Sequence, residues 1–212
     1  MKGQHWNAQA VGSLLQTATR PSLLVPHVRV SGVDAIDFAR LRRSGATAVV
    51  FDKDNTITAP YALSIHPPFL HAWQQSISVF GRENVVIVSN SAGSNNDKGH
   101  KEALRIQEAL GVHVLRHTEK KPGGAHELLA HLNNRPPSEV AVVGDRLLTD
   151  VVYANRMGAV SILTTNIITE KGDNSFAIVL RRFEKRVLLP VLELFGVKSP
   201  QNSVADRYKS EA

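Results

Sequence analysis

The strongest constraint on the fold is a series of apolar, β-branched runs that alternate with segments of helical periodicity. Runs such as AVVF and VAVV carry no polar residue, so strands built from them would be buried on both faces. This is typical of a parallel sheet that is covered by helices on each side. The sequence therefore predicts an α/β fold with a Rossmann-like parallel sheet and helices on both faces. The predicted strands are residues 47–52, 83–90, 112–117, 138–145 and 159–165, and the predicted helices are residues 67–81, 97–110, 123–134 and 148–158.

Polar residues gather at the ends of four of these predicted strands. The strings DKDN, SNS, EKKP and GD end or follow the first, second, third and fourth strand in turn. The carboxyl ends of parallel strands lie at one edge of the sheet, where ligands bind. We therefore expect the four strings to meet in one crevice.

Asp52 and Asp54 are two residues apart at the end of the first predicted strand. Residues at this spacing face the same side of an extended segment, where two carboxylates can bind Mg²⁺. Asp52 could then attack a phosphorus atom, while Asp54 protonates the departing oxygen and later activates water. The structural alternative is a strand end followed by a turn with both acids solvated.

Three further groups of polar residues lie at the other strand ends. Asp145 can complete a metal site, with Asp150 in support. Ser89 and Asn90 suit a phosphate oxygen, and Lys121 can neutralise a phosphoryl group. Taken singly, these groups can also be acids at a helix N-terminus, a serine-rich turn and a surface lysine.

Taken together, the order DxDxT, S, K-P, GDxxxxD over residues 46–165 resembles the haloacid dehalogenase (HAD) superfamily of phosphatases. The resemblance implies that Asp52 is the nucleophile and Asp54 the acid/base. It also implies a Mg²⁺ site formed by Asp52, Asp145 and the backbone carbonyl of Asp54. The remaining implied roles are phosphate binding by Ser89 and Asn90, a bridging cation at Lys121, and support from Asp150 and Thr56.

A cap domain in this superfamily would be inserted after the first motif or between the second and third. Residues 57–88 and 90–120 are already filled by the predicted helices and strands of the core. The sequence therefore predicts a capless enzyme with an open site. Such a site can admit bulky phosphates.

The strings FDKDNTITAPY, VSNSAG and GDRLLTDVVYANRMGA are similar to the mitochondrial phosphatidylglycerophosphatases of fungi and their bacterial and plant relatives. This resemblance implies removal of the terminal phosphate from phosphatidylglycerophosphate, a step of cardiolipin biosynthesis. It also implies a location on the matrix face of the mitochondrial inner membrane. Two alternatives stay open: a phosphatase for soluble sugar phosphates, nucleotides or nucleic acid ends, and a non-catalytic anion or RNA binder.

Composition excludes several classes of protein. The chain has no cysteine, which rules out disulfides, a thiolate metal site and a cysteine phosphatase. Its 212 residues suit one domain with appended arms, and no apolar run approaches the roughly 18 to 20 residues of a membrane span. The net charge of +6 indicates an anionic partner without choosing which.

The segments around the phosphatase core, residues 46–170, carry weaker signals. Residues 1–45 are expected to form an N-terminal arm with a helix at residues 8–20, although a stretch without acids here is also compatible with an organellar transit peptide. Residues 171–197 are expected to form a basic and apolar helical segment. Residues 198–212 are expected to be a flexible tail.

The helical segment after the core carries a basic cluster, Arg181, Arg182, Lys185 and Arg186, and is expected to be interrupted or kinked at Pro190. We expect this cluster to face an anionic phospholipid surface, where each basic residue contributes on the order of 1 kcal/mol. The expected partners are therefore the phospholipid substrate and the membrane surface, and no nucleic acid. The alternative is that this segment completes the core or a homo-oligomer contact.

Overall fold

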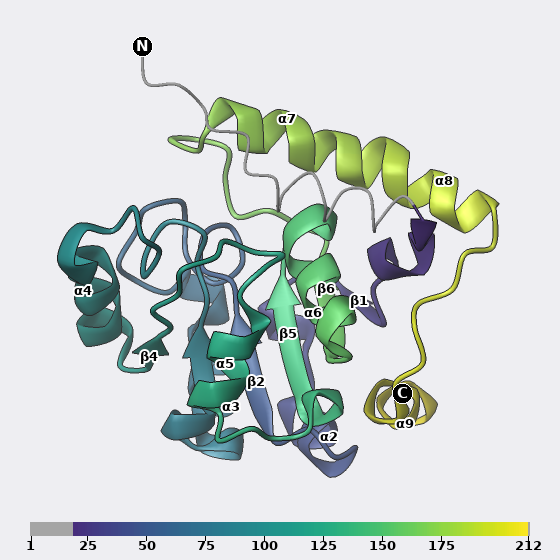
Figure 1. Ribbon diagram of the computed structural model, residues 1–212, viewed down its shortest axis with the longest axis horizontal. Coiled ribbons are helices and arrows are strands. Elements are labelled where there is room, and N and C mark those ends of the chain that lie inside the picture. The colour runs from purple at the N-terminus through teal and green to yellow at the C-terminus, as the bar shows by residue number, and fades with distance from the viewer. Residues whose placement is uncertain (1–18, 212) are drawn as a thin grey trace.

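The structure, a computed structural model, describes residues 19–211 (Figure 1). The helix predicted at residues 8–20 lies outside the described residues apart from its last two positions. Within the described part of the chain, no helix combines the length and the apolar character needed to cross a membrane.

A parallel sheet of six strands forms the centre of the protein, in the order β1-β6-β5-β2-β3-β4. The α/β class predicted from the sequence is therefore confirmed, and all five predicted strands are present with shorter bounds. β2 lies between β5 and β3, with Phe51 opposite both Val143 and Ile87. The strands are β1 (Val28–Val30), β2 (Ala48–Phe51), β3 (Val85–Ile87), β4 (His113–Val114), β5 (Val140–Gly144) and β6 (Val160–Thr164).

Helices cover both faces of this sheet, and each predicted core helix is present. Within residues 19–211, no cap domain separates the strands, because α3 is the one α-helix between β2 and β3 and α4 the one between β3 and β4. The helices are α2 (Phe38–Arg43), α3 (Leu70–Phe80), α4 (Lys101–Leu110), α5 (Ala125–His131), α6 (Val152–Met157), α7 (Ser175–Phe183), α8 (Leu189–Leu194) and α9 (Ser203–Ser210).

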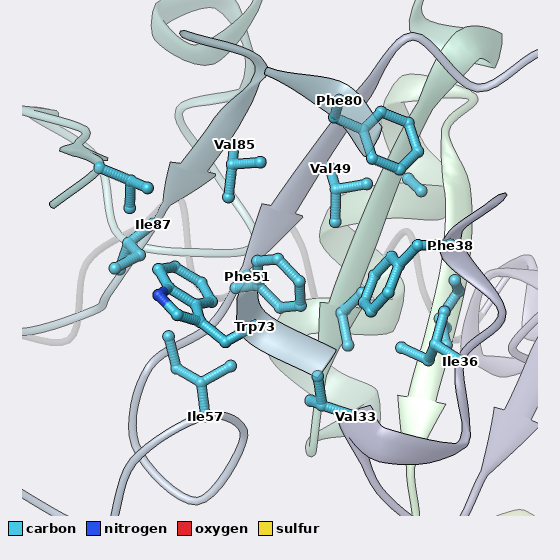
Figure 2. Packing of buried hydrophobic residues seen from close by; sticks show 14 of the residues in the cluster. Val33, Ile36, Phe38, Val49, Phe51, Ile57, Trp73, Phe80, Val85 and Ile87 are labelled. Atoms are coloured by element: carbon cyan, nitrogen blue, oxygen red, sulfur yellow. The ribbon is translucent and has the colours of Figure 1, made fainter. Parts of the chain in front are cut away.

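The alternating side chains of β2 show why its sequence is apolar at every position. Val49 and Phe51 belong to a cluster with side chains of α2, α3, α4 and α9, whereas Ala48 and Val50 belong to a cluster with α5 and α6. Figure 2 shows Phe51 between Phe38 and Trp73, whose ring centroids lie 6.1 and 5.5 Å from that of Phe51 in edge-on arrangements. Burial on both faces fixes the strand whose end carries Asp52.

The expected N-terminal arm, residues 1–45, does not stay outside the core. Its residues Val28–Val30 form β1, which pairs with β6 at the edge of the sheet, and α2 packs beneath the sheet. Sequence reasoning missed β1 because it is three residues long and has exposed Arg29 at its centre.

His27, just before β1, joins distant parts of the chain. Its Nδ1 lies 2.8 Å from the Ser161 hydroxyl on β6, and its Nε2 lies 2.9 Å from the Pro200 carbonyl oxygen. Asn155 of α6 accepts from the same Ser161 hydroxyl at 2.8 Å and donates to the Leu23 and Val25 carbonyls. Both flanks of the core are thereby attached to one edge of the sheet.

The expected flexible tail, residues 198–212, is wrong for most of its length. It contains α9, which buries Val204, Ala205 and Tyr208 in the main core cluster. The Tyr208 hydroxyl also accepts from the backbone N–H of Asp37 at 3.2 Å. A few buried positions are enough to attach this eight-residue helix, so the rest of its sequence is polar and resembles a flexible tail.

The C-terminal helical segment, expected to be interrupted or kinked at Pro190, keeps helical backbone dihedrals there, and its α-helical pattern is interrupted just before this residue. A π-type turn, η8 (Glu184–Leu188), joins α7 to α8, and the backbone stays helical on both sides of it. Wide turns of this kind accommodate local irregularities such as a residue without an N–H donor. In Figure 1, α7 and α8 run as one rod across the top of the view.

We predict that Asn202→Ala lowers the free energy of unfolding by about 1–2 kcal/mol. The Asn202 side chain accepts from the N–H groups of Val204 and Ala205 at the start of α9, and it donates to the Ser138 and Gly158 carbonyls. Urea unfolding checks this. Gln201→Ala, at the exposed neighbouring position, is the control and should change stability by less than about 0.5 kcal/mol. Equal stability of both variants would contradict a structural role for this segment.

Candidate active site

The loop after β2 begins the site. The Asp52 N–H donates to the Val143 carbonyl of β5, which continues the strand pairing to the position of this acid. The chain then turns back, with N–H groups of Ile57 and Thr58 donating to the Lys53 carbonyl. Asn55 takes a left-handed φ of 63°, a conformation that asparagine adopts more readily than most residues.

Three carboxylates lie together at the carboxyl edge of the sheet. Asp52 follows β2, Asp145 follows β5, and Asp150 belongs to the turn η7 (Leu147–Val151) that opens α6. One oxygen from each lies within 4.8 Å of the others, and Asp145 and Asp150 are buried. The adjacency of β2 and β5 explains why residues so far apart in the sequence meet here.

Gly144 makes this approach possible. A Cβ atom at position 144 would lie 2.4 Å from the Asp150 side chain, closer than any side chain tolerates. The glycine before Asp145 is therefore required for Asp150 to lie against the end of β5.

Lys121 bridges two of the carboxylates from the third strand end. Its Nζ lies 2.7 Å from Asp52 Oδ1 and 2.6 Å from Asp150 Oδ1, and its side chain is buried. Burial alone would lower the pKa of Lys121, but the charges of Asp150 and Asp52 outweigh it and hold the pKa above its usual range. The lysine is thus a buried cation of the cluster and not a surface residue.

Burial raises the pKa of Asp52 to about 7, with the Lys121 charge opposing the shift and the Asp150 and Asp145 charges adding to it. Burial likewise raises the pKa of Asp145, against the charge of Arg181. Three acids this close favour a further cation, because their mutual repulsion is relieved when positive charge enters.

A cleft of about 270 Å³ opens onto the cluster. The predicted site residues that line it are Asp52, Asp54, Ser89, Asn90, Lys121, Asp145 and Asp150. Thr56 lies beneath it, where its hydroxyl donates to Asp52 Oδ2 at 3.4 Å. The structure therefore brings the predicted residues to one place, as the four strings at the strand ends indicated.

Asp54 and Asn90 make contacts that the sequence did not indicate. The Asp54 carboxylate stands outside the carboxylate cluster and accepts from Lys53 Nζ at 2.7 Å and from the Tyr61 N–H at 3.0 Å. The Asn90 side chain accepts from the Lys121 N–H at 2.7 Å and donates to the Lys121 carbonyl at 3.3 Å, so it positions the lysine. Metal binding by the Asp54 carbonyl and phosphate binding by Ser89 and Asn90 stay predictions.

Arg181 of α7 belongs to this site, which corrects its expected place on a lipid-facing surface. It is 5% exposed, its Nε pairs with Asp145, and its Nη1 lies 2.9 Å from Asp173 Oδ2. Asp173 also accepts from Asn55 Nδ2 at 2.9 Å. Nothing local in the sequence marks these pairs, because they join residues 8 to 118 positions apart.

Glu184, one turn after Arg181, is a second residue that the sequence did not indicate. Its buried carboxylate accepts from the N–H groups of Leu147 at 2.9 Å and Leu148 at 3.4 Å, at the start of the turn that carries Asp150. Burial raises the pKa of Glu184 to about 7. The residue positions the turn and does not line the cleft.

The donor set fits a divalent cation that prefers oxygen ligands. Asp145 Oδ1 is buried and has no hydrogen-bond partner among the described residues, so it is free to bind a cation. The other oxygens of the cluster are carboxylates of Asp52 and Asp150, the ligand type that Mg²⁺ prefers.

Comparison with known proteins shows the relationship of the chain. The family model of the mitochondrial PGP phosphatases matches residues 8–169. The chain belongs to this family. Its matched residues include all the predicted site residues and end before α7.

Relatives in this family come from plants, algae and fungi. The chain is 36% identical over 189 residues to phosphatidylglycerophosphate phosphatase 1, chloroplastic/mitochondrial, of Arabidopsis thaliana, covering 88% of this chain and 53% of the relative. It is 36% identical over 207 residues to phosphatidylglycerophosphate phosphatase 1, chloroplastic, of Chlamydomonas reinhardtii, covering 95% and 75%. It is 37% identical over 172 residues to phosphatidylglycerophosphatase GEP4, mitochondrial, of Saccharomyces cerevisiae, covering 79% and 86%.

The chain thus spans about half the length of the Arabidopsis relative and at least three quarters of the other two. No solved structure matches the chain significantly.

We predict that Glu184→Ala lowers the free energy of unfolding by about 1–3 kcal/mol, because the buried N–H group of Leu147 and the partly buried N–H group of Leu148 lose their acceptor. Glu184→Gln keeps an acceptor oxygen and should lose less. Glu108→Ala, at an exposed position of α4, is the control and should leave stability within about 0.5 kcal/mol of wild type.

Wild type and Glu184→Gln also test the titration of the Glu184 carboxyl group. Because its folded pKa, about 7, lies above the ordinary 4.5, its contribution is fully present below pH 4.5 and is lost as the pH rises through 7. Urea unfolding at pH 5 and pH 8 should therefore show wild type losing stability relative to Glu184→Gln at the higher pH. A constant difference would contradict this.

Proposed function

We propose that this protein is a Mg²⁺-dependent phosphatidylglycerophosphatase, which releases the terminal phosphate of phosphatidylglycerophosphate to give phosphatidylglycerol. The observation that carries the proposal is the cluster of Asp52, Asp145 and Asp150 with Lys121, in a chain of the mitochondrial PGP phosphatase family. The names of the relatives supply the substrate.

In the first step, a carboxylate oxygen of Asp52 bonds to phosphorus, and the bond from phosphorus to the glycerol oxygen breaks. Lys121, within 2.7 Å of Asp52, holds the nucleophile in place and offsets the negative charge that the phosphoryl group brings. Asp54 donates its proton to the departing oxygen. The chain is left with an aspartyl-phosphate at Asp52.

In the second step, Asp54 takes a proton from water, whose oxygen attacks the phosphorus. The Asp52–phosphorus bond breaks, and inorganic phosphate leaves. Lys53, which is almost fully buried, holds the Asp54 carboxylate at the wall of the cleft between these steps. Mg²⁺ bound by Asp52, Asp145 and the Asp54 carbonyl, with Asp150 in support, would supply positive charge for the phosphoryl oxygens.

The proposed location follows the names of the relatives, which are mitochondrial or chloroplastic. We place the protein in the mitochondrion, on the matrix face of the inner membrane. A peripheral attachment is consistent with the open, uncapped cleft, since a lipid headgroup can enter it without passing a second domain.

We predict that phosphate release from phosphatidylglycerophosphate in mixed micelles exceeds release from soluble sugar phosphates, nucleotides and nucleic acid ends. Asp52→Asn should reduce turnover at least about 10³-fold because the nucleophile is lost. Circular dichroism and thermal melting of this variant should remain those of a folded protein. A preference for a soluble ester would favour the alternative function. Normal turnover by Asp52→Asn would contradict a mechanism in which Asp52 is the nucleophile.

We predict that removal of divalent cations with EDTA abolishes turnover and that Mg²⁺ restores it. Mg²⁺ should also raise the melting temperature of the wild-type protein, because a ligand that binds the folded state stabilises it. Asp145→Asn should lose this thermal shift, whereas Asp34→Asn, at an exposed position before the core, should retain it. An unchanged shift in Asp145→Asn would exclude this aspartate as a ligand.

A further inference from the structure

A line of exposed apolar side chains runs along the outer side of α7, η8 and α8. We call it the outer stripe, and it accounts for seven of the ten exposed large hydrophobic side chains among residues 19–211. Phe176 is 74% exposed and Leu194 is 83% exposed, so the two ends of the stripe are more exposed than its middle. The outer stripe consists of Phe176, Val179, Phe183, Val187, Val191, Leu194 and Phe195.

The spacing of these residues, mostly three or four positions apart, places them on one side of the helical rod. The opposite side is already occupied. Arg181 lines the cleft, and Glu184 accepts from N–H groups of η7. Leu189 and Leu192 are buried against residues of η1 (Pro21–Leu24), η7 and α6. A surface helix ordinarily buries its apolar side and exposes its polar side. Here an apolar side remains outside, and a continuous patch of this kind marks a contact surface.

The charge around the outer stripe selects the kind of partner. Arg186 is exposed beside it, and so is Arg182, which is paired with Glu170. The acids of α7, η8 and α8 are Glu184, which is buried, and Glu193, which is exposed and paired with Arg29. A second copy of the same surface would bring like charges together. An anionic bilayer offers both an apolar interior for the stripe and negative headgroups for Arg186.

The outer stripe also begins at the mouth of the catalytic cleft. Asn174, Ala177 and Arg181 line the cleft, and Phe176 and Val179 lie between them in the sequence but point outward. One short helix therefore has the cleft along one side and the outer stripe along the other. A phosphate in the cleft and an acyl chain beside Phe176 could belong to the same lipid molecule.

We infer that the outer stripe of α7–α8 docks on the surface of an anionic phospholipid bilayer, so that a lipid headgroup reaches the cleft while its acyl chains remain in the membrane. The inference rests on the proposed function for the nature of the substrate. It differs from the sequence-based expectation in the residues that make contact: Arg181 faces inward, and Lys185 is half-buried with its Nζ 2.9 Å from the Thr165 carbonyl. Of the basic cluster, Arg186 remains for the membrane, whereas Arg182 is exposed but paired with Glu170.

The test is co-sedimentation of the full chain with two kinds of vesicle. One kind contains phosphatidylcholine alone, and the other also contains about 30 mol% phosphatidylglycerol, an anionic lipid that attracts basic residues. Wild type should bind the anionic vesicles. The double variant Phe183→Glu/Leu194→Glu should bind at least tenfold more weakly, because two apolar contacts are replaced by charges repelled by the lipid. Arg186→Glu should weaken binding about fivefold or more, and added salt should narrow its difference from wild type.

Leu104→Glu is the matched control, since Leu104 is 52% exposed on α4, away from the outer stripe. It should bind vesicles like wild type. All variants should keep the wild-type melting temperature and, without vesicles, hydrolyse the soluble ester p-nitrophenyl phosphate at the wild-type rate. The double variant should lose activity on phosphatidylglycerophosphate only when that lipid is embedded in vesicles.

Vesicle binding is measured without substrate, so it is independent of the proposed function. Failure of wild type to hydrolyse phosphatidylglycerophosphate in micelles would overturn the proposed function. The docking surface would then be tested by vesicle binding alone. Equal binding by wild type and the double variant would overturn the docking surface. A dimer in analytical ultracentrifugation that the double variant converts to monomer, with vesicle binding unchanged, would assign the outer stripe to a second copy and overturn it as well.

Discussion

Three carboxylates within 4.8 Å of one another require positive charge, and much of the structure serves to supply it. Isolated buried ions are strongly disfavoured, and removing one partner of a buried ion pair typically costs about 3–5 kcal/mol. Lys121, in the loop after β4, pairs with Asp52 and Asp150, while Arg181 of α7 pairs with Asp145. The cluster therefore ties the central strands to two distant segments of the chain.

This requirement gives α7 a double role. Arg181 of α7 and Glu184 of the adjoining turn η8 complete the charge and the backbone hydrogen bonding around the carboxylates. Asp173, just before the helix, links Arg181 to Asn55 of the nucleophile loop. The helix that exposes the outer stripe is thus held by the polar contacts of the site as well as by the apolar contacts of Leu189 and Leu192. A surface attached in this way keeps a fixed orientation relative to the cleft.

The parts of the fold that the sequence predicted are those with strong local signals. The strand ending at Asp52 was recognisable because both of its faces are buried, so its apolar run is uninterrupted. β1 was not predicted because three residues with Arg29 at the centre are too few to show an alternating pattern. α9 was not predicted because few of its positions are buried. Within the site, Asp52, Asp145 and Lys121 sit at strand ends in a recognisable order. Arg181 and Asp173 could not be predicted in this way, since their partners are determined by the packing of α7 and not by any spacing in the sequence.

The attachment of His27 has a consequence for the order in which the chain can fold. β1 pairs with a strand 134 residues later, and His27 bonds to a carbonyl 173 residues later. During synthesis, an early segment must therefore wait for β6 and then for Pro200 before its contacts exist. Contacts across such separations form late, because the chain loses the entropy of closing a long loop before these contacts can stabilise it. A nascent chain that ends soon after the three carboxylates still lacks β6, so β5 has an unpaired edge and β1 has no partner. That edge of β5 is a site for chaperone binding or for mispairing until β6 emerges.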